Sequence, residues 1–423
     1  MSTVKSKNLQ IGTDGTASNN FTIYTPGTPD GTLRVGNGNA GAATDKVTIT
    51  SAGNMTVTGS ITANGSTLAT QNSLGVRNLI INGDMRIAQR GTSVAGIGTG
   101  DAYYTIDRIK TGITAAGTWT QSQSTDVPTG QGFSYSSKSE CTTADASLSS
   151  GSYLTWQYAI EGQNLQHLKY GTASAESLTL SFWVKSNKTG TYILEMRKTG
   201  TLTKQLSRSY TIDVANTWEK KTIVIDGDTA DGIVNNNTLG MLILWWLGAG
   251  TNLTTGTQQT SWGTSVNINR AAGLTVNLAD TVGNYINFTG VQLEVSSVST
   301  DFEFVPYDME LARCQRYCVS YGGSTIYEPL GIGTETSGTN ASIQLGLPVT
   351  MRGAISVTAS NLGNIRVADG SAFSTVTGIF IDMYGQQQVM FNATVASGLA
   401  ATRACRLIAD NSLAPRIIFT SEL

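Results

Sequence analysis

The stretch VRNLIINGDMRIAQRG, residues 76–91, marks the point at which the chain changes character. Two short apolar runs flank the turn-forming triplet Asn82-Gly83-Asp84. The residues before this stretch are rich in Gly, Thr and Asn and poor in aromatic side chains. The residues after it repeatedly alternate apolar and polar side chains, which is the pattern of β-strands. The sequence therefore predicts that an extended N-terminal segment ends here and that a globular β-domain begins.

The composition is that of a β-rich protein with an uncharged surface. Of the 423 residues, 39% are hydrophobic and only 13% are charged, against about 25% in an average protein. The net charge is −2 and no domain-sized basic patch is visible, so we expect no nucleic-acid partner. The longest apolar run, MLILWWL at residues 241–247, has the length of a buried strand, so we expect no membrane insertion.

The pattern of residues 1–75 predicts an N-terminal β-stalk. Val47 and Ile49, followed by Met55 and Val57 and then by Ile61, fall on one face of short alternating strands. Such strands are too thinly apolar to hold a core alone, and an isolated hairpin is only marginally stable in water. Three identical chains wound around one axis would share this apolar stripe, so a homotrimer is the preferred interpretation. The alternative is a flexible linker that contains one hairpin.

Residues 76–305 predict a two-sheet jelly roll. In YLTWQYAI (residues 153–160) and SLTLSFWVKS (residues 177–186), apolar side chains occupy every second position. Many such strands without a helical period between them favour an antiparallel sandwich. Trp156 and Trp245 are expected to lie in its core.

One linking helix is predicted at residues 306–321, before a smaller C-terminal β-domain at residues 322–423. Asp308 is the expected N-cap, just after Pro306. One helical stripe would contain Leu311, Cys314, Cys318 and Tyr321. The predicted fold class is therefore all-β, with a β-stalk, a jelly-roll sandwich, a linking helix and a second β-domain. We expect all four cysteines to be buried and free, as in a chain made in a reducing cytoplasm.

Several segments resemble, in the same order, a known family of phage proteins. NLIINGDMRIAQRGTSV (residues 78–94) with YYTIDRI (residues 103–109) resembles the opening of a carbohydrate-binding-module-like domain found in many bacteriophage tail-fibre proteins. LTLSFWVKS, TWEKKTIVID and YINFTGVQLEV are similar to later strands of that jelly roll. DFEFVPYDMELARCQRYCVSY is similar to its closing signature, and LPVTMRGAISVTAS to the segment that follows. Met85, Ile109 and Cys318 stand where members often carry aromatic residues, and all three remain apolar.

This resemblance implies a structural virion protein, a homotrimeric tail fibre that recognises host-surface glycans and is not an enzyme. Residues 1–75 would then be its stalk or virion-attachment segment. Its partners would be copies of itself, other tail, neck or capsid proteins, and a host glycan. One alternative is a purely architectural fibre or adaptor on the capsid, neck or tail, without a receptor of its own. A further alternative is a tailspike that depolymerises glycans.

Glycan-binding modules stack sugars on exposed aromatic rings and bind hydroxyl groups with Asn, Gln or Asp. The aromatic residues in polar sequence surroundings are the candidates: Trp119, Trp183, Trp262, Tyr103 and Tyr104. Asp84, Asp107 and Arg108 are instead expected to form a structural polar network that caps strand ends.

No catalytic residue is predicted. The single histidine, His167, has no nucleophile motif such as G-x-S-x-G to accompany it. Glu161, Glu195 and Glu294 could in principle meet as a glycosidase pair, but the separation of two carboxylates cannot be read from a sequence.

No metal or other cofactor is predicted either. Cys314 and Cys318 are assigned to core packing and not to a metal. Asp226, Asp228 and Asp231 crowd one loop; a solvated turn is the preferred interpretation, and a structural calcium site is the alternative.

Overall fold

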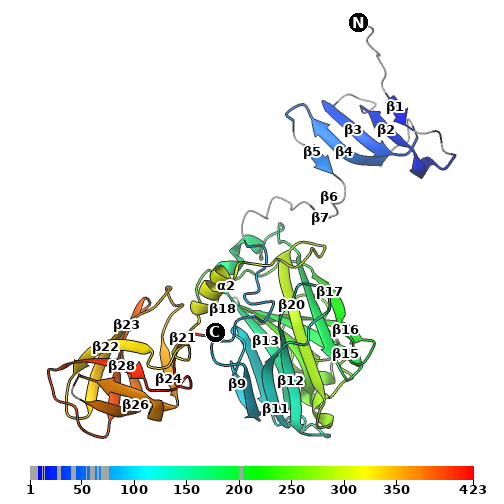
Figure 1. The fold of residues 1–423 in the computed structure, drawn as a ribbon. Helices are drawn as coiled ribbons and strands as arrows, with labels where there is room; N and C mark the ends of the chain where they lie inside the picture. The colour runs from blue at the N-terminus through cyan, green and yellow to red at the C-terminus, as the bar shows by residue number, and fades with distance from the viewer. Residues whose placement is uncertain are drawn as a thin grey trace. The chain divides into compact units, whose positions relative to one another are not determined.

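The computed structural model describes residues 8–11, 13, 15–25, 30–39, 44–53, 55–57, 62–63, 66–67, 76–199, 203–370 and 372–423. The chain divides into two compact units, Met1–Gly75 and Val76–Leu423. Strands make up most of the regular structure in both units (Figure 1). The all-β prediction is therefore confirmed.

The first unit contains one layer of five antiparallel strands, in the order β1-β2-β3-β4-β5. The strands are β1 (Asn8–Ile11), β2 (Phe21–Tyr24), β3 (Thr32–Asn37), β4 (Thr44–Thr50) and β5 (Met55–Val57). Val47 pairs with Val57 and Ile49 with Met55, so these four side chains share one face as predicted. Ile61, the fifth residue of the predicted stripe, lies outside the described residues. A linker with a single hairpin is wrong for this region, because five strands pair in register. A short strand pair follows, β6 (Thr62–Ala63) with β7 (Ser66–Thr67).

The second unit begins with a sandwich of two antiparallel sheets. The seven-stranded sheet has the order β19-β16-β15-β18-β13-β10-β9, and the six-stranded sheet has the order β17-β14-β20-β12-β11-β8. The strands of the first sheet are β9 (Gly100–Ala102), β10 (Ile109–Thr114), β13 (Tyr153–Glu161), β15 (Gly190–Thr199), β16 (Thr203–Ile212), β18 (Leu239–Ala249) and β19 (Gly263–Thr264). Those of the second are β8 (Ser93–Ile97), β11 (Thr118–Ser124), β12 (Ser136–Thr143), β14 (Leu178–Ser186), β17 (Glu219–Ile225) and β20 (Tyr285–Val295).

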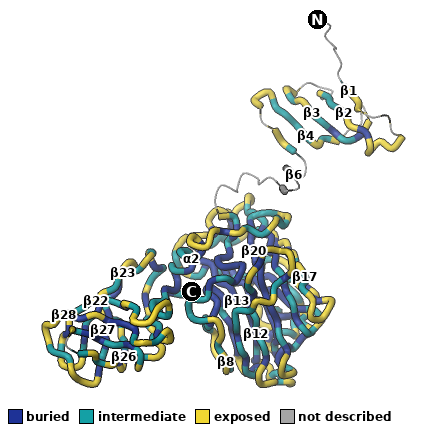
Figure 2. Tube along the Cα trace, viewed as in Figure 1, coloured by how far each residue is buried: buried dark blue, intermediate teal, exposed yellow. Residues whose placement is uncertain are grey.

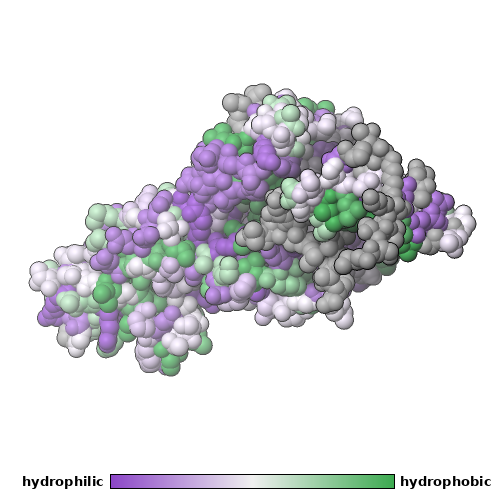
Figure 3. Space-filling model, turned by 90° about the horizontal axis from the view of Figure 1, so that it is seen from above, coloured by the Kyte–Doolittle hydropathy of each residue, from purple (hydrophilic) through white to green (hydrophobic). Residues whose placement is uncertain are grey.

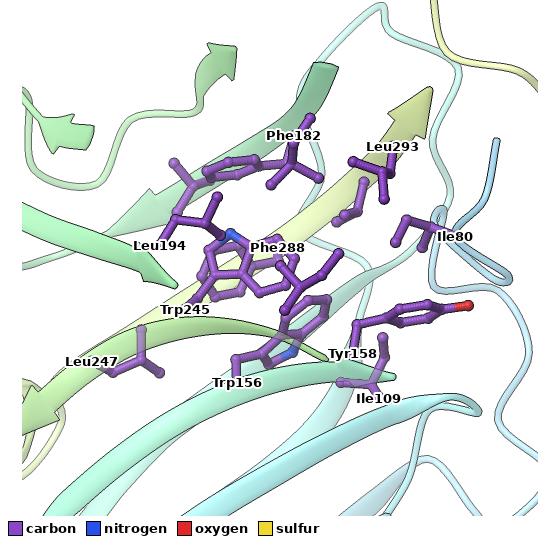
Figure 4. Close-up of a cluster of buried hydrophobic side chains, with 14 of the residues drawn as sticks. Ile80, Ile109, Trp156, Tyr158, Phe182, Leu194, Trp245, Leu247, Phe288 and Leu293 are labelled. Atoms are coloured by element: carbon purple, nitrogen blue, oxygen red, sulfur yellow. The ribbon is translucent and has the colours of Figure 1, made fainter. Parts of the chain in front are cut away.

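Aromatic rings fill the space between the two sheets (Figure 4). Trp156 of β13 meets Trp245 of β18 edge to face, with ring centroids 4.7 Å apart. Phe288 of β20 lies 5.0 Å from Trp156, so the six-stranded sheet closes the cluster. The expected core positions of both tryptophans are confirmed, since both are at most 1% exposed.

The sequence stretch that opens the sandwich forms a tight turn around Asn82. Asn82 and Met85 both have positive φ angles, and Met85 N–H donates to Asn82 O at 3.0 Å. The Asn82 side-chain amide donates to Ile87 O at 2.8 Å and Asp107 O at 3.0 Å, and its oxygen accepts from Ile87 N–H. At Gly83, an added Cβ would lie 2.1 Å from Val291 O, so only glycine fits this close approach to β20.

The predicted helix is shorter than expected. Helix α2 covers Tyr307–Gln315, with Pro306 and not Asp308 at the N-cap position. Cys314 is buried on the helix, but Cys318 begins strand β21 (Cys318–Tyr321). The prediction of one helical stripe was therefore wrong beyond Cys314, because the helix ends at Gln315 and a strand begins at Cys318. All four cysteines are buried and free, as expected.

The C-terminal region forms a closed six-stranded barrel with its own core, and Figure 2 shows buried segments in dark blue within it. Its strands are β22 (Pro329–Glu335), β23 (Asn340–Gly346), β25 (Ile365–Ala368), β26 (Phe373–Gly385), β27 (Gln388–Val395) and β28 (Ala404–Ala409). A three-stranded sheet, β21-β29-β24, adjoins it, with β24 (Ser356–Ser360) and β29 (Arg416–Thr420). Several apolar side chains of the barrel face solvent, and Figure 3 shows hydrophobic patches, in green, on its surface at the left.

The chain after β29 joins the barrel region to the sandwich. Glu422 pairs with Arg108 and with Arg90, the latter at 2.8 Å. The Arg108 guanidinium also lies 3.5 Å from the centre of the Tyr317 ring and donates to Ala159 O at 2.6 Å.

Asp84, Asp107 and Arg108 were expected to bond one another in a single network, but each of them bonds a different partner. Asp84 pairs with Arg86 at 3.0 Å, and Asp107 accepts from the Gln89 side chain at 2.5 Å. Arg108 turns instead to Glu422, because that acidic side chain arrives from the far end of the chain.

Candidate carbohydrate-binding surface

Trp119 cannot serve as a stacking platform. It is 1% exposed and its indole N–H donates to Ala116 O at 2.8 Å inside the sandwich. Its polar sequence neighbours, Thr118 and Thr120, point away from the core because side chains alternate along a strand. The assignment of Trp119 to a glycan site was therefore wrong.

Three further candidates are engaged in packing within the protein. The Tyr103 hydroxyl donates to Leu423 O at 3.0 Å, Arg90 lies 5.5 Å from its ring, and burial raises its pKa to about 12. Tyr104 packs half-buried against the sandwich core. Trp262 donates to Asp226 O at 2.9 Å. The five predicted aromatic residues therefore do not gather at one place.

Trp183 lies on the outer face of the six-stranded sheet. Its neighbours on β14, Phe182 and Val184, point into the core, and Trp183 is half-buried on the opposite side. It faces Lys220 of β17 and Thr289 of β20 in register. This tryptophan is the predicted candidate whose surroundings best match a binding surface.

A second tryptophan, Trp218, lies just before β17 on the same face. Its indole N–H donates to Asp126 Oδ1 at 3.0 Å, and Lys185 Nζ donates to Asp126 Oδ2 at 2.8 Å. Lys185 follows Trp183 by two positions on β14, so both side chains face outward together. Trp218 and Lys185 therefore share the carboxylate of Asp126, and Trp183 lies on the same outer face, two positions before Lys185. The sequence analysis missed Trp218, because nothing local signals its bond to a residue 92 positions away.

Asp126 is a charged acceptor that solvent can reach. Partial burial raises its pKa, but the hydrogen bonds from Lys185 and Trp218 outweigh this effect and hold the pKa below its ordinary value. Its side chain is 43% exposed. An ionised carboxylate beside an aromatic ring is an arrangement that can bind sugar hydroxyls while the ring covers the apolar face of the sugar.

Tyr285 extends this surface along β20. Its hydroxyl donates to Asn216 Oδ1 at 2.7 Å, and Lys138 Nζ lies 5.1 Å from the ring centre. We name the set Asp126, Trp183, Lys185, Trp218 and Tyr285 the Trp183–Trp218 surface.

The outer face of the seven-stranded sheet also carries charged and aromatic residues, but the ring of its tryptophan, Trp246, is covered by other side chains. Trp246 is 1% exposed, donates to Glu195 Oε2 at 3.0 Å, and lies beneath Arg270, 5.0 Å from the ring centre. Burial raises the pKa of Glu195 despite its pairing with Arg270 at 3.0 Å. This face offers a buried ion pair and no accessible indole.

The three glutamates that could have formed a glycosidase pair do not meet. Glu161 is bound by Arg316 at 2.7 Å, and Glu195 by Arg270. Glu294 belongs to the other sheet, where it accepts from Thr300 at 2.7 Å. The possibility of a shared site for these residues was therefore wrong.

The acidic loop holds an ammonium group. Lys198 is completely buried, and its Nζ lies 3.0 Å from Asp228 Oδ2, 2.8 Å from Asp231 Oδ2 and 2.5 Å from Asp231 O. The Asp226 side chain is 87% exposed and turns outward. Neither a calcium loop nor a solvated turn describes this site, because a lysine charge compensates the two inward-facing carboxylates. Among the described residues, no three His, Cys, Asp or Glu side chains gather as metal ligands would.

None of the helices in the described ranges has the length and apolar content that crossing a lipid bilayer requires.

Comparisons with known proteins yield distant structural likenesses only. No family model and no curated protein matches the sequence. The enzymatically active domain of tailspike protein 4 of bacteriophage CBA120 is 15% identical with a TM-score of 0.28, covering 52% of this chain and 21% of that chain. The chain thus spans about a fifth of the length of that tailspike chain.

Carbohydrate-active proteins are also among the similar structures. The family 11 carbohydrate-binding module of a cellulosomal cellulase of Clostridium thermocellum is 10% identical with a TM-score of 0.24, covering 51% of this chain and 94% of that module. An agarase is 9% identical with a TM-score of 0.21, covering 72% of this chain and 47% of that chain. At these identities and TM-scores, the likenesses carry no argument about ligand or activity.

Proposed function

We propose that this chain is a structural, non-enzymatic subunit of a bacteriophage tail fibre that attaches the virion to a glycan on the host surface. Three copies would form the fibre, and other virion proteins would hold it on the particle. The sequence resemblance supports the virion role. The observation that carries glycan binding is the accessible Asp126 carboxylate, which Trp218 and Lys185 both bond, on an outer sheet face that also bears the half-buried Trp183.

The proposed contact is a stacking interaction supported by hydrogen bonds. A sugar ring would lie against Trp183 or Trp218, and the Asp126 carboxylate and the Lys185 ammonium would bind its hydroxyl groups. One such contact is weak, since a millimolar dissociation constant corresponds to about −4 kcal/mol. Several copies on one particle would bind a repetitive glycan much more strongly, without any new contact.

The test is retention of the full chain on an array of purified bacterial lipopolysaccharides and capsular polysaccharides. We expect Trp183→Ala and Trp218→Ala each to weaken binding at least tenfold. Trp262→Ala removes an equally half-buried tryptophan from the same sandwich and is expected to bind as the wild type does. Loss of binding in Trp262→Ala alone would place the site elsewhere.

Two other outcomes assign the alternative functions. A wild-type chain that binds no polysaccharide on the array would favour a purely architectural fibre or adaptor. Shortening of a polysaccharide during incubation, measured by size-exclusion chromatography, would favour a depolymerising tailspike.

A further inference from the structure

The five-stranded sheet of the first unit has one apolar face, and the described residues of that unit form no second sheet over it. The pairing register aligns its apolar side chains in adjacent rows across the strands. The apolar face consists of Leu9, Ile11, Phe21, Ile23, Leu33, Val35, Val47, Ile49, Met55 and Val57. We name these ten residues the apolar sheet face.

The opposite face carries the polar and charged groups of the sheet. Arg34 pairs with Asp45 at 2.7 Å and with Asp30, and Tyr24 donates to Asp45. The Thr22 hydroxyl donates to Gly38 O at 2.9 Å. The charges are therefore compensated on one side of the sheet, and no charged side chain belongs to the apolar sheet face.

All ten side chains of the apolar sheet face remain at least partly accessible to water. Leu9, Ile11 and Met55 are more than half exposed, at 56%, 55% and 57%. In the described part of this unit no apolar side chain is fully buried, and Figure 2 draws most of the unit in yellow and teal. A sheet with one hydrophobic face is stable only when a second layer covers that face.

We propose that the apolar sheet face is the surface through which three copies of this chain associate, each copy turning this face toward a common axis and covering part of the same face on the other two. A self-complementary partner fits, because a face without charge offers a different protein no ion pair to recognise. Identical copies also supply a second sheet of the same width and the same apolar pattern.

The size of the face is compatible with a specific contact. Five strands about 4.8 Å apart, with about five residues at 3.3 Å each, give a face of roughly 24 by 16 Å. Three copies that turn this face inward would therefore bury roughly 1,100 Å² in total, which is close to the lower limit for a specific interface. The inference rests on the proposed function only in that a fibre contains several copies of its subunit.

The test compares two adjacent positions of β4 in the full-length chain. Val47→Asp places a charge within the apolar sheet face, and Thr48→Asp places the same charge on the opposite face, where Thr48 pairs with Arg34. Light scattering at micromolar concentration should give wild type and Thr48→Asp a mass that is a multiple of 44.6 kDa, and Val47→Asp a mass of 44.6 kDa. A three-fold mass is expected for the proposed fibre.

Cross-linking supplies a second measurement that does not depend on loss of assembly. Val47→Cys should form a disulfide between copies under mild oxidation, whereas Thr48→Cys should not. The four native cysteines are buried and leave this readout clear. A monomeric wild type, an unchanged mass in Val47→Asp, or equal cross-linking at both positions would overturn the inference.

Assembly and glycan binding are read separately in these variants. All seven tryptophans lie in residues 119–262, so an unchanged fluorescence spectrum shows that the sandwich of Val47→Asp is intact. That monomer should still bind a soluble oligosaccharide with the wild-type affinity. Failure of that binding would count against the Trp183–Trp218 surface and not against the apolar sheet face.

Discussion

Lys198 is the residue on which the acidic loop of the sandwich depends. Its ammonium group lies 3.0 Å from the Asp228 carboxylate and 2.8 Å from the Asp231 carboxylate. Lys198→Met keeps most of the side-chain volume but removes the positive charge that pairs with the buried Asp228. We expect a loss of about 3–5 kcal/mol in the free energy of unfolding. Urea titration followed by tryptophan fluorescence measures this loss for the sandwich alone, because every tryptophan lies there.

Lys169→Met is the matched control for that experiment. Lys169 pairs with Glu176 at 2.6 Å, but both side chains are exposed to solvent. An exposed pair contributes at most about 1 kcal/mol. Equal destabilisation by the two substitutions would contradict a special role for Lys198.

Asp84 should make the stability of the sandwich depend on pH. Burial raises its pKa from 3.8 to about 6, although Arg86 opposes the shift. Between about pH 4 and pH 6 the folded state holds a proton that the unfolded state releases, so stability falls as pH rises through this window. In Asp84→Asn this part of the dependence, up to about 3 kcal/mol, should be absent. Urea midpoints at pH 4.5 and pH 7 measure it.

A solvent-facing acid provides the comparison for Asp84. Asp213 has a side chain that is 67% exposed, so Asp213→Asn should keep the wild-type dependence on pH. If Asp84→Asn also keeps it, another group, such as Asp107 with its similarly raised pKa, is responsible.

At the scale of elements, the segment after β29 attaches the barrel region to the sandwich. Glu422 meets Arg108, which is 1% exposed, and Arg90. Glu422→Gln removes the negative charge and leaves a buried guanidinium without its counter-charge, which costs about 3 kcal/mol. Hydrogen exchange should become faster in β21 and β29 and stay unchanged in β26 and β27. Glu140→Gln, which alters an exposed pair with Lys138, should change neither region.

Alternation along the strands was the part of the fold that could be predicted. Leu154, Trp156 and Tyr158 on β13 face the core as the two-residue period requires. The alternation holds at Trp119 as well, but the inward face was misjudged because Gln121, two positions later, is polar and yet buried, and bonds Thr105 and Thr111 inside the sandwich. A polar residue in the core conceals which face of the strand points inward.

The candidate surface was predictable only in part. Trp183 was found because its strand alternates cleanly. The other residues of this surface, Trp218 and Asp126, could not be predicted. They lie in segments far apart in the sequence that meet only after the sheets form. Asp226, Asp228 and Asp231 were grouped correctly, but Lys198 could not be foreseen because it reaches them from another strand.

At the scale of the whole molecule, assembly and adhesion should be coupled. If several copies bind one surface together, Val47→Asp should lower the apparent affinity for a dense polysaccharide layer by roughly 10²–10⁴-fold. Thr48→Asp should leave it unchanged. Surface plasmon resonance on a dense and on a sparse layer separates the effects, because the difference between variants should shrink on the sparse layer. Equal loss on both layers would mean that the substitution damages the binding site itself.

Lys198 has a consequence for the environments in which the sandwich stays folded. A bound metal ion leaves when a chelator or simple dilution lowers its free concentration, whereas a side chain is tethered to the chain it stabilises. This loop therefore keeps its internal positive charge at low ionic strength, at high ionic strength and where metal ions are sequestered.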